Sequence, residues 1–174
     1  MKLLKTEIKN NVLKDMEQIL DENRDELLRA NQRDLDAFDR DDRALYDRLV
    51  VNQKKIDLMI QAVREVRLQD DPVNQEILTR ELDNGLKIIN KTAPFGTIMI
   101  IYESRPDVTV EAAVLAFKSN NKILLKGGKE AYHSNKVLVK FWHQALEKNQ
   151  LPIDFIQFLE MDRAQTQEFL KNPN

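Results

Sequence analysis

The sequence predicts an α/β fold in which a helical N-terminal region precedes half of a doubly wound parallel sheet. Three observations lead to this prediction. Up to about residue 80, apolar residues recur every three or four positions, which is the period of amphipathic helices. The turn signal Asp83-Asn84-Gly85 then separates this region from short, β-branched apolar runs. Beyond the turn, strand and helix patterns alternate with short links, an order that implies parallel strands with right-handed crossovers.

Residues 1–82 are expected to form four helices, whose apolar stripes are typical of core packing. The alternating charges from Asp34 to Arg43 are interpreted as a solvated helix face. Asp70-Asp71-Pro72 ends the helical pattern, because proline disfavours helix at the residue before it. The four stripes consist of Leu4, Ile8, Val12, Met16, Ile19 and Leu20; Leu27, Leu28, Leu35 and Phe38; Leu45, Leu49 and Val50; and Ile56, Leu58, Met59, Ile60, Val63 and Val66.

Residues 83–93 are expected to form a connection that contains a partly exposed strand, Leu86–Lys91. The next run, Thr97–Tyr102, is continuously apolar and β-branched, which is typical of a strand covered on both faces. Asp107 is placed to act as the N-cap of a helix over Val108–Phe117. That helix is apolar nearly all round and must therefore be buried on most sides.

Residues 94–174 as a whole are expected to form a partial α/β domain, because three strands make only half of a doubly wound sheet. The sequence stops at Asn172-Pro173-Asn174, where a further strand is expected. The remaining elements are a strand at Lys122–Leu125, an amphipathic helix at Glu130–Lys148, a strand at Phe155–Leu159, and a short helix opened by a capping box of Asp162 and Gln165.

The composition narrows the function classes. With 27 Lys and Arg against 29 Asp and Glu, the net charge is −2, whereas a generic binder of nucleic acid or anionic membranes carries a basic excess. The chain has no Cys, which excludes disulfides, thiolate metal sites and thiol nucleophiles within it. No apolar run approaches the ~20 residues of a membrane helix, and the N-terminus lacks the apolar core of a signal peptide, so we expect a cytoplasmic protein.

The segment Lys126-Gly127-Gly128-Lys129-Glu130 follows a strand and opens a helix, where ligands of open α/β sheets bind. Glycines there let a ligand approach the backbone, and free helix N-terminal N–H groups beside two ammonium groups favour an anion. The alternative is an ordinary tight turn with surface lysines. The pattern is neither a G-x-G-x-x-G fingerprint nor a P-loop.

A second segment, Tyr102–Asp107, ends the first buried strand at the same edge of the sheet. Arg105 is able to grip a phosphate or carboxylate with two parallel hydrogen bonds, which Lys cannot match. The alternative is a structural ion pair with Glu103, Asp107 or Glu111.

The two histidines do not indicate a metal site. His133 and His143 are ten residues apart, which places them on different faces of one helix. Ser134 has no accompanying Ser-His-Asp motif and is interpreted as a helix-surface residue. We therefore predict no metal.

The residues of these segments closely resemble gamma-glutamyl phosphate reductase, also called glutamate-5-semialdehyde dehydrogenase, of the aldehyde dehydrogenase superfamily. The resemblance rests on FGTIMIIYESRPDVTVEAA at 95–113 and on KILLKGGKEA at 122–131 followed by Ser134-Asn135, two motifs that are highly specific at this spacing. It extends over essentially the whole chain and implies a Rossmann-like sheet of the aldehyde dehydrogenase type. Family members are more than twice as long, so the chain resembles their N-terminal portion without the nucleophilic cysteine.

The resemblance implies NADPH-dependent reduction of the small molecule L-glutamyl 5-phosphate to L-glutamate 5-semialdehyde, with release of phosphate, in proline biosynthesis. The cysteine that performs the covalent step in the family is absent here, so no catalytic residue is expected in this chain, and the chain alone is expected to be inactive. A homo-oligomer is also implied, formed partly through the hairpin region that Leu86–Lys91 resembles.

The resemblance also implies the site residues. A cationic Lys129 facing the adenine ribose should favour a 2′-phosphate and hence NADPH. Arg105 and Asp107 are the candidate substrate-binding residues. Where typical aldehyde dehydrogenases place an asparagine that supports the oxyanion, this chain has Ser104-Arg105-Pro106-Asp107. The expected cofactor-binding residues are Tyr102, Glu103, Ser104, Lys126, Gly127, Gly128, Lys129 and Glu130.

One function from another class remains open. The amphipathic N-terminal helices also permit a non-catalytic α/β module that acts through protein contacts, as a regulatory or assembly partner.

Overall fold

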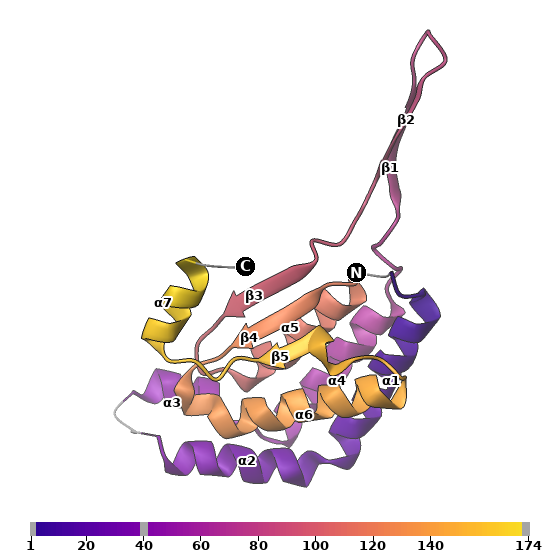
Figure 1. The fold of residues 1–174 in the computed structure, drawn as a ribbon. Helices are drawn as coiled ribbons and strands as arrows, with labels where there is room; N and C mark the ends of the chain where they lie inside the picture. The colour runs from indigo at the N-terminus through magenta and orange to yellow at the C-terminus, as the bar shows by residue number, and fades with distance from the viewer. Residues whose placement is uncertain (1–2, 39–41, 172–174) are drawn as a thin grey trace.

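A computed structural model describes residues 3–38 and 42–171 (Figure 1). Residues 39–41 of the expected charged face and the terminal Asn172-Pro173-Asn174 lie outside this described part. Helices pack under one face of a small parallel sheet, and a two-stranded hairpin projects from this body (Figure 1).

The four predicted N-terminal helices are confirmed. The first and fourth pack against each other, and the first and second also contact a later helix beneath the sheet. The third and fourth are opened by side-chain caps, in which Asp42 accepts from the Leu45 N–H and Asn52 from the Lys55 N–H. The bounds are α1 Thr6–Glu22, α2 Arg24–Asp36, α3 Arg43–Leu49 and α4 Gln53–Leu68.

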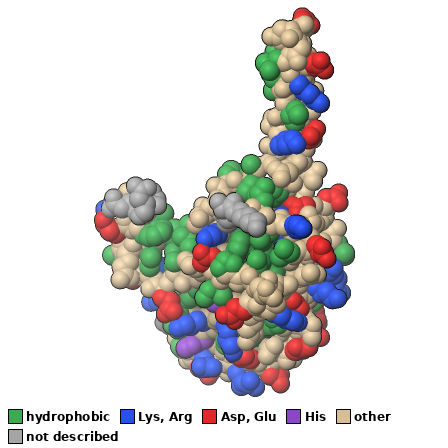
Figure 2. All heavy atoms as spheres, turned by 45° about the vertical axis from the view of Figure 1, so that its right-hand side comes forward, with side chains coloured by type: hydrophobic (Ala, Val, Ile, Leu, Met, Phe, Trp, Pro, Cys, Tyr) green, Lys and Arg blue, Asp and Glu red, His purple; other side chains and the backbone are tan. Residues whose placement is uncertain are grey.

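The hairpin corrects one expectation. Strand β1, Glu76–Glu81, pairs antiparallel with β2, Lys87–Lys91, so the region 1–82 ends in a strand that was not expected, whereas the expected strand at Leu86–Lys91 is confirmed. Six residues are too few to show a helical period, and their backbone groups are instead satisfied across the hairpin. Both strands are exposed throughout, and the hairpin carries both apolar and charged side chains along its length (Figure 2).

The sheet has the expected parallel order. Its strands are β3 Thr97–Ile101, β4 Lys122–Lys126 and β5 Ile156–Phe158, arranged in chain order, with helices α5 Pro106–Lys118 and α6 Tyr132–Lys148 as crossovers. The fold class is therefore confirmed. Short 3-10 turns at Lys129–Ala131 and Ile153–Phe155 delay the start of α6 and of β5 relative to the predicted bounds.

The predicted capping box is confirmed at the start of the last helix, α7 Arg163–Lys171. Asp162 Oδ1 accepts from the Gln165 N–H at 2.8 Å, and Gln165 Oε1 accepts from the Asp162 N–H at 2.9 Å. Two N–H groups at this helix start are thereby satisfied reciprocally.

Strand β3 is covered on one face only, which corrects the expectation of two covered faces. Its in-register pairing places Ile98 opposite the buried Ile123 of β4, on the side of α5 and α6. Met99 and Ile101 point to the other face, and the Ile101 side chain is 55% exposed. In the described part of the chain β3 also forms one edge of the sheet. A continuous apolar run predicts that a strand is buried. It does not indicate which elements pack against each of its two faces.

Helix α5 begins earlier than expected, so Asp107 is not its N-cap. Arg105 occupies the cap position, Pro106 is the first helical residue, and Asp107 is the second. Proline is well suited to that first position because its φ is preset and it has no N–H to satisfy. The helix packs Phe117 against Trp142, with ring centroids 6.2 Å apart, although Leu115 on its outer side is 58% exposed.

Candidate functional site

A cleft of about 1160 Å³ lies at the carboxyl ends of β3 and β4. The two segments that follow these strands meet there, and the Tyr102 N–H extends the sheet ladder by donating to the Lys126 carbonyl at 3.1 Å. The predicted juxtaposition of the two segments is therefore confirmed. All eight predicted cofactor-binding residues line the cleft: Tyr102, Glu103, Ser104, Lys126, Gly127, Gly128, Lys129 and Glu130.

The two glycines allow the neighbouring segments to pack closely, and their role in binding a ligand stays a prediction. A Cβ on Gly127 would collide with the Asn135 amide nitrogen and lie 3.1 Å from the Tyr102 ring. A Cβ on Gly128 would collide with the Ser104 hydroxyl and lie 3.1 Å from the Ser104 backbone nitrogen. A side chain at either position would therefore meet the corner after β3 or helix α6, so only glycine fits there.

A buried chain of hydrogen bonds ties this wall of the cleft together. The Tyr102 hydroxyl lies 2.7 Å from Thr109 Oγ1, which donates in turn to Asn135 Oδ1 at 2.7 Å. Burial raises the pKa of Tyr102 to about 12, so the phenol stays protonated at neutral pH. The end of β3 is thereby connected to α5 and α6, and the positions of the two corners are coupled.

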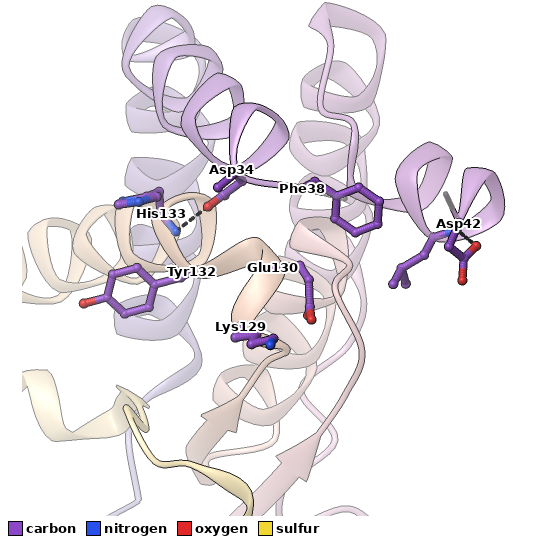
Figure 3. A pocket seen from close by; sticks show the side chains of 9 residues that line it. Asp34, Phe38, Asp42, Lys129, Glu130, Tyr132 and His133 are labelled. Atoms are coloured by element: carbon purple, nitrogen blue, oxygen red, sulfur yellow. Dashed lines mark hydrogen bonds between the residues drawn. The ribbon is translucent and has the colours of Figure 1, made fainter. Parts of the chain in front are cut away.

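The start of α6 is already occupied by a carboxylate of the protein. Asp34, near the end of α2, accepts from the backbone N–H of His133 at 2.9 Å (Figure 3). It also accepts from the backbone N–H of Ser134 at 2.8 Å. Three interpretations are corrected by this contact. Asp34 is 3% exposed and not part of a solvated face; Ser134 is buried and not on the surface; and these N–H groups of α6 are not free to bind an external anion.

A smaller hollow of about 680 Å³ adjoins the cleft and shares Asp42, Leu45, Lys129 and Glu130 with it. Figure 3 shows its walls, with the Phe38 ring from the end of α2 and Tyr132 from the start of α6.

Most charged groups of the cleft have partners. Arg48 of α3 pairs with Glu103 at 2.9 Å, and Lys126 Nζ donates to the Gly127 carbonyl at 2.9 Å. Glu130 accepts from the Ser104 hydroxyl at 2.5 Å. Within the described residues, the cationic groups of Lys129 and Arg163 make neither a hydrogen bond nor an ion pair. The cleft therefore offers two cationic groups without a direct partner, in a lining whose formal charges balance, since Asp42, Glu103, Glu130 and Asp162 stand against Arg48, Lys126, Lys129 and Arg163.

Arg105 and Asp107 are held by each other and are not among the lining residues of the cleft. Arg105 Nη2 lies 2.9 Å from Asp107 Oδ2, and this hydrogen bond raises the pKa of Arg105. Burial lowers the pKa of nearby Lys55, whose ammonium donates to the Asp47 and Arg48 carbonyls. The structural ion pair considered for Arg105 is thus present, and the substrate role of both residues stays a prediction.

Sequence reasoning missed two walls of the cleft. They come from α3 and from α7 with the residues just before it, segments in which the sequence shows no ligand-binding motif. The capping box located the start of α7 without indicating that the helix turns towards the sheet end. The missed lining residues are Asp42, Ala44, Leu45, Arg48, Ile101, Met161, Asp162, Arg163, Thr166, Gln167 and Leu170.

The remaining chemistry of the described residues is limited. Within residues 3–38 and 42–171, no three carboxylate or imidazole groups come together as metal ligands. His143 Nε2 lies 2.7 Å from the Ile156 carbonyl, whereas the His133 ring packs against the Tyr132 ring with centroids 5.3 Å apart, so the two imidazoles have different neighbours. None of the described helices combines the length and apolarity needed to span a membrane.

The fold and the position of the cleft define the class: the chain has an aldehyde dehydrogenase-type fold. A solved propionaldehyde dehydrogenase of Rhodopseudomonas palustris superposes with a TM-score of 0.66 at 15% identity, covering 98% of this chain and 36% of that one. A second, from Clostridium phytofermentans, gives a TM-score of 0.63 at 10% identity, covering 97% and 35%. At these identities the likeness concerns the fold alone.

The predicted resemblance to gamma-glutamyl phosphate reductases is confirmed over nearly the whole chain. The crystal structure of the Thermotoga maritima protein of that name has a TM-score of 0.89 at 40% identity, covering 96% of this chain and 41% of that one. The Saccharomyces cerevisiae protein gives 0.84 at 30% identity, covering 92% and 42%. The Aquifex aeolicus gamma-glutamyl phosphate reductase is 42% identical over 171 residues, 97% of this chain. No family model matches the sequence.

The matches also show what share of the relatives' length this chain covers. The chain spans about two fifths of the length of the curated relatives it matches, 39% in the case of the Aquifex protein.

Proposed function

We propose that this chain is the N-terminal, cofactor-binding part of an NADPH-dependent gamma-glutamyl phosphate reductase. Such an enzyme reduces L-glutamyl 5-phosphate to L-glutamate 5-semialdehyde and releases phosphate, a step of proline biosynthesis in the cytoplasm. The observation that supports this proposal most directly is the cleft, since both resembling motifs line it at the carboxyl ends of parallel strands.

The residues present fit a phosphorylated dinucleotide. The cleft volume of about 1160 Å³ suits a ligand larger than an ordinary drug-sized molecule, whose pockets run from about 300 to 1,000 Å³. Lys129 contributes an unpaired ammonium group for a phosphate. Glu130 also lines the cleft; one of its carboxylate oxygens accepts from the Ser104 hydroxyl, and the other is suited to accept from a ribose hydroxyl. When bound, NADPH would supply the hydride for the reduction.

In the proposed reaction, this chain binds and orients the cofactor. The corner after β3 and the turn after β4 are fixed to each other by the Tyr102 ladder bond and the Ser104–Glu130 contact, so the wall that receives the cofactor is preorganised. No Cys is present in the 174 residues. We therefore propose that this chain alone does not catalyse the reaction.

Arg105 and Asp107 are proposed to contact the acyl phosphate substrate. Their mutual ion pair lies at the start of α5, and both side chains are partly exposed. In an active full-length relative, replacing the residue equivalent to Arg105 should raise the KM for the acyl phosphate far more than the KM for NADPH. The opposite split would contradict the role.

The cofactor proposal is tested by titrating the chain with NADP⁺ and NAD⁺ in a calorimeter. NADP⁺ should bind more tightly, and Lys129→Glu should reverse or abolish that preference, because a carboxylate repels a 2′-phosphate and accepts a hydrogen bond from a free 2′-hydroxyl. Lys54→Glu, an equal charge change at an exposed site of α4, serves as the control. Failure of both nucleotides to bind would sink the proposal.

A homo-oligomer is proposed as well, through the hairpin of β1 and β2. Two-stranded hairpins are marginal on their own in water, and this one exposes Ile77, Leu78, Ile88 and Ile89. The same exposed apolar hairpin also favours the alternative function, a non-catalytic module that binds other proteins.

A further inference from the structure

The two cationic groups of the cleft that have no direct partner come from segments that follow neighbouring strands. Lys129 lies in the turn after β4, and Arg163 is the first residue of α7, which follows β5. Because β4 and β5 are adjacent parallel strands, the segments after them leave the sheet at the same rim. Both residues line the cleft.

The two acidic residues nearest to Arg163 in the sequence have other hydrogen-bond partners. Asp162 accepts the Gln165 N–H as the helix cap. Glu160 accepts from the Tyr132 hydroxyl at 2.7 Å and pairs with Lys136 at 3.0 Å, contacts that lower the pKa of Glu160. Neither carboxylate is within ion-pair distance of Arg163 in the described structure. Its guanidinium is therefore available to an anion from outside the chain.

The two cations differ in what they offer. A guanidinium presents parallel N–H donors to two oxygens of one phosphate, whereas an ammonium acts as a point charge. A phosphate monoester carries a charge of about −1.5 to −2 at pH 7 and three acceptor oxygens, so it can engage both groups at once. The pyrophosphate that links the two halves of a dinucleotide also carries about two charges, but it spreads them over two phosphorus centres with only two free oxygens on each. A pair of unlike cations thus matches a terminal phosphate best.

From this arrangement we propose that Arg163 acts together with Lys129 as a specificity-determining residue for a phosphate monoester, the 2′-phosphate of the adenine nucleotide. This inference rests on the proposed cofactor function of the cleft. It adds Arg163, from a helix without a ligand-binding motif, to the residues proposed to bind the cofactor. In this proposal Arg163 donates two parallel hydrogen bonds to two oxygens of the phosphate.

The test uses two halves of the cofactors as probes, adenosine 2′,5′-bisphosphate and 5′-AMP, titrated calorimetrically into the chain. Arg163→Gln should weaken the bisphosphate at least tenfold and change 5′-AMP less than twofold. Arg163→Lys should restore part of the loss, because it returns the charge without the bidentate geometry. Arg29→Gln, an exposed arginine of α2, is the matched control and should change neither affinity.

The possible failures are distinguishable. If wild-type chain binds both probes and Arg163→Gln weakens them equally or leaves both unchanged, the inference is overturned while the proposed cofactor site stands. If wild-type chain binds neither probe, the proposed function fails and the inference fails with it. Since Arg163 is exposed, far-ultraviolet circular dichroism of each variant should match that of the wild type.

Discussion

The carboxylate of Asp34 accepts two hydrogen bonds from Ser134, one from its backbone N–H at 2.8 Å and one from its hydroxyl at 2.6 Å. The two residues are separated by 100 positions in the chain. Through this contact the end of α2 caps α6, and the helical region fixes the helix that follows the turn of the candidate site. A negative charge also complements the positive end of the helix dipole.

Asp34→Asn should therefore destabilise the fold although the side chain keeps its shape. It removes the charge and directs an amide donor at groups that are themselves donors, which should lower the free energy of unfolding by about 1–3 kcal/mol. Urea unfolding followed by circular dichroism measures the change. Asp36→Asn, at an exposed position of the same helix, should stay within about 0.5 kcal/mol of wild type. Equal effects of the two variants would contradict the capping role.

Gly128→Ala should destabilise by about 1–3 kcal/mol, because the added Cβ meets the Ser104 hydroxyl and lies 3.1 Å from the Ser104 backbone nitrogen. In a double-mutant cycle, Ser104→Ala should relieve part of the cost, giving a coupling energy above about 0.5 kcal/mol. Strict additivity of the two variants, or a stable Gly128→Ala protein, would show that the two corners are not packed as described.

Asp71 should make stability depend on pH at the acidic end. Burial acts to raise its pKa, but hydrogen bonds from Lys9 at 2.7 Å and from Thr6 outweigh it, so the folded pKa lies below the usual value of 3.8. A carboxyl with a depressed folded pKa stabilises the protein fully above its unfolded pKa, and the contribution is lost as pH falls through the folded one.

Asp71→Asn should consequently lower the free energy of unfolding by about 1–3 kcal/mol at pH 7, and by progressively less as pH falls below about 3.8. Urea midpoints measured from pH 7 to pH 2 give the difference. Asp70→Asn, the exposed neighbour, is the control. A difference that stays constant over the whole range would argue against the ion pair with Lys9.

Introducing a charge into the hairpin of β1 and β2 should weaken self-association of the chain. If the homo-oligomer forms through β1 and β2, Ile88→Lys should lower the sedimentation coefficient at micromolar concentrations and leave the melting temperature unchanged, since this side chain is 49% exposed. Leu58→Lys, at a 55% exposed position of α4, provides the control. A wild-type chain that sediments as a monomer at every concentration would exclude the hairpin as a self-association surface.

Some residues of the candidate site could be predicted from the sequence, and others could not. Tyr102 and Lys126 were placed correctly because each ends a strand, and parallel strands with short links end at one rim. Arg163 was not found, since a helix cap indicates where a helix begins but gives no information about the direction in which it leaves the sheet. The sequence indicated that Gly127 and Gly128 are needed at this turn. The structure shows why: the side chains of Asn135 and Ser104 leave no room for a Cβ there.

The sequence by itself determined the order of the elements, the parallel sheet and the meeting of two segments at its end, because local periodicity and short connections leave few other topologies. Only the tertiary structure decided that Asp34 occupies the start of α6, that residues 76–81 pair as a strand, and that α7 supplies a wall of the cleft. These outcomes depend on contacts between distant residues. Their energies come from burial and hydrogen bonding in the assembled fold, to which local propensity contributes little.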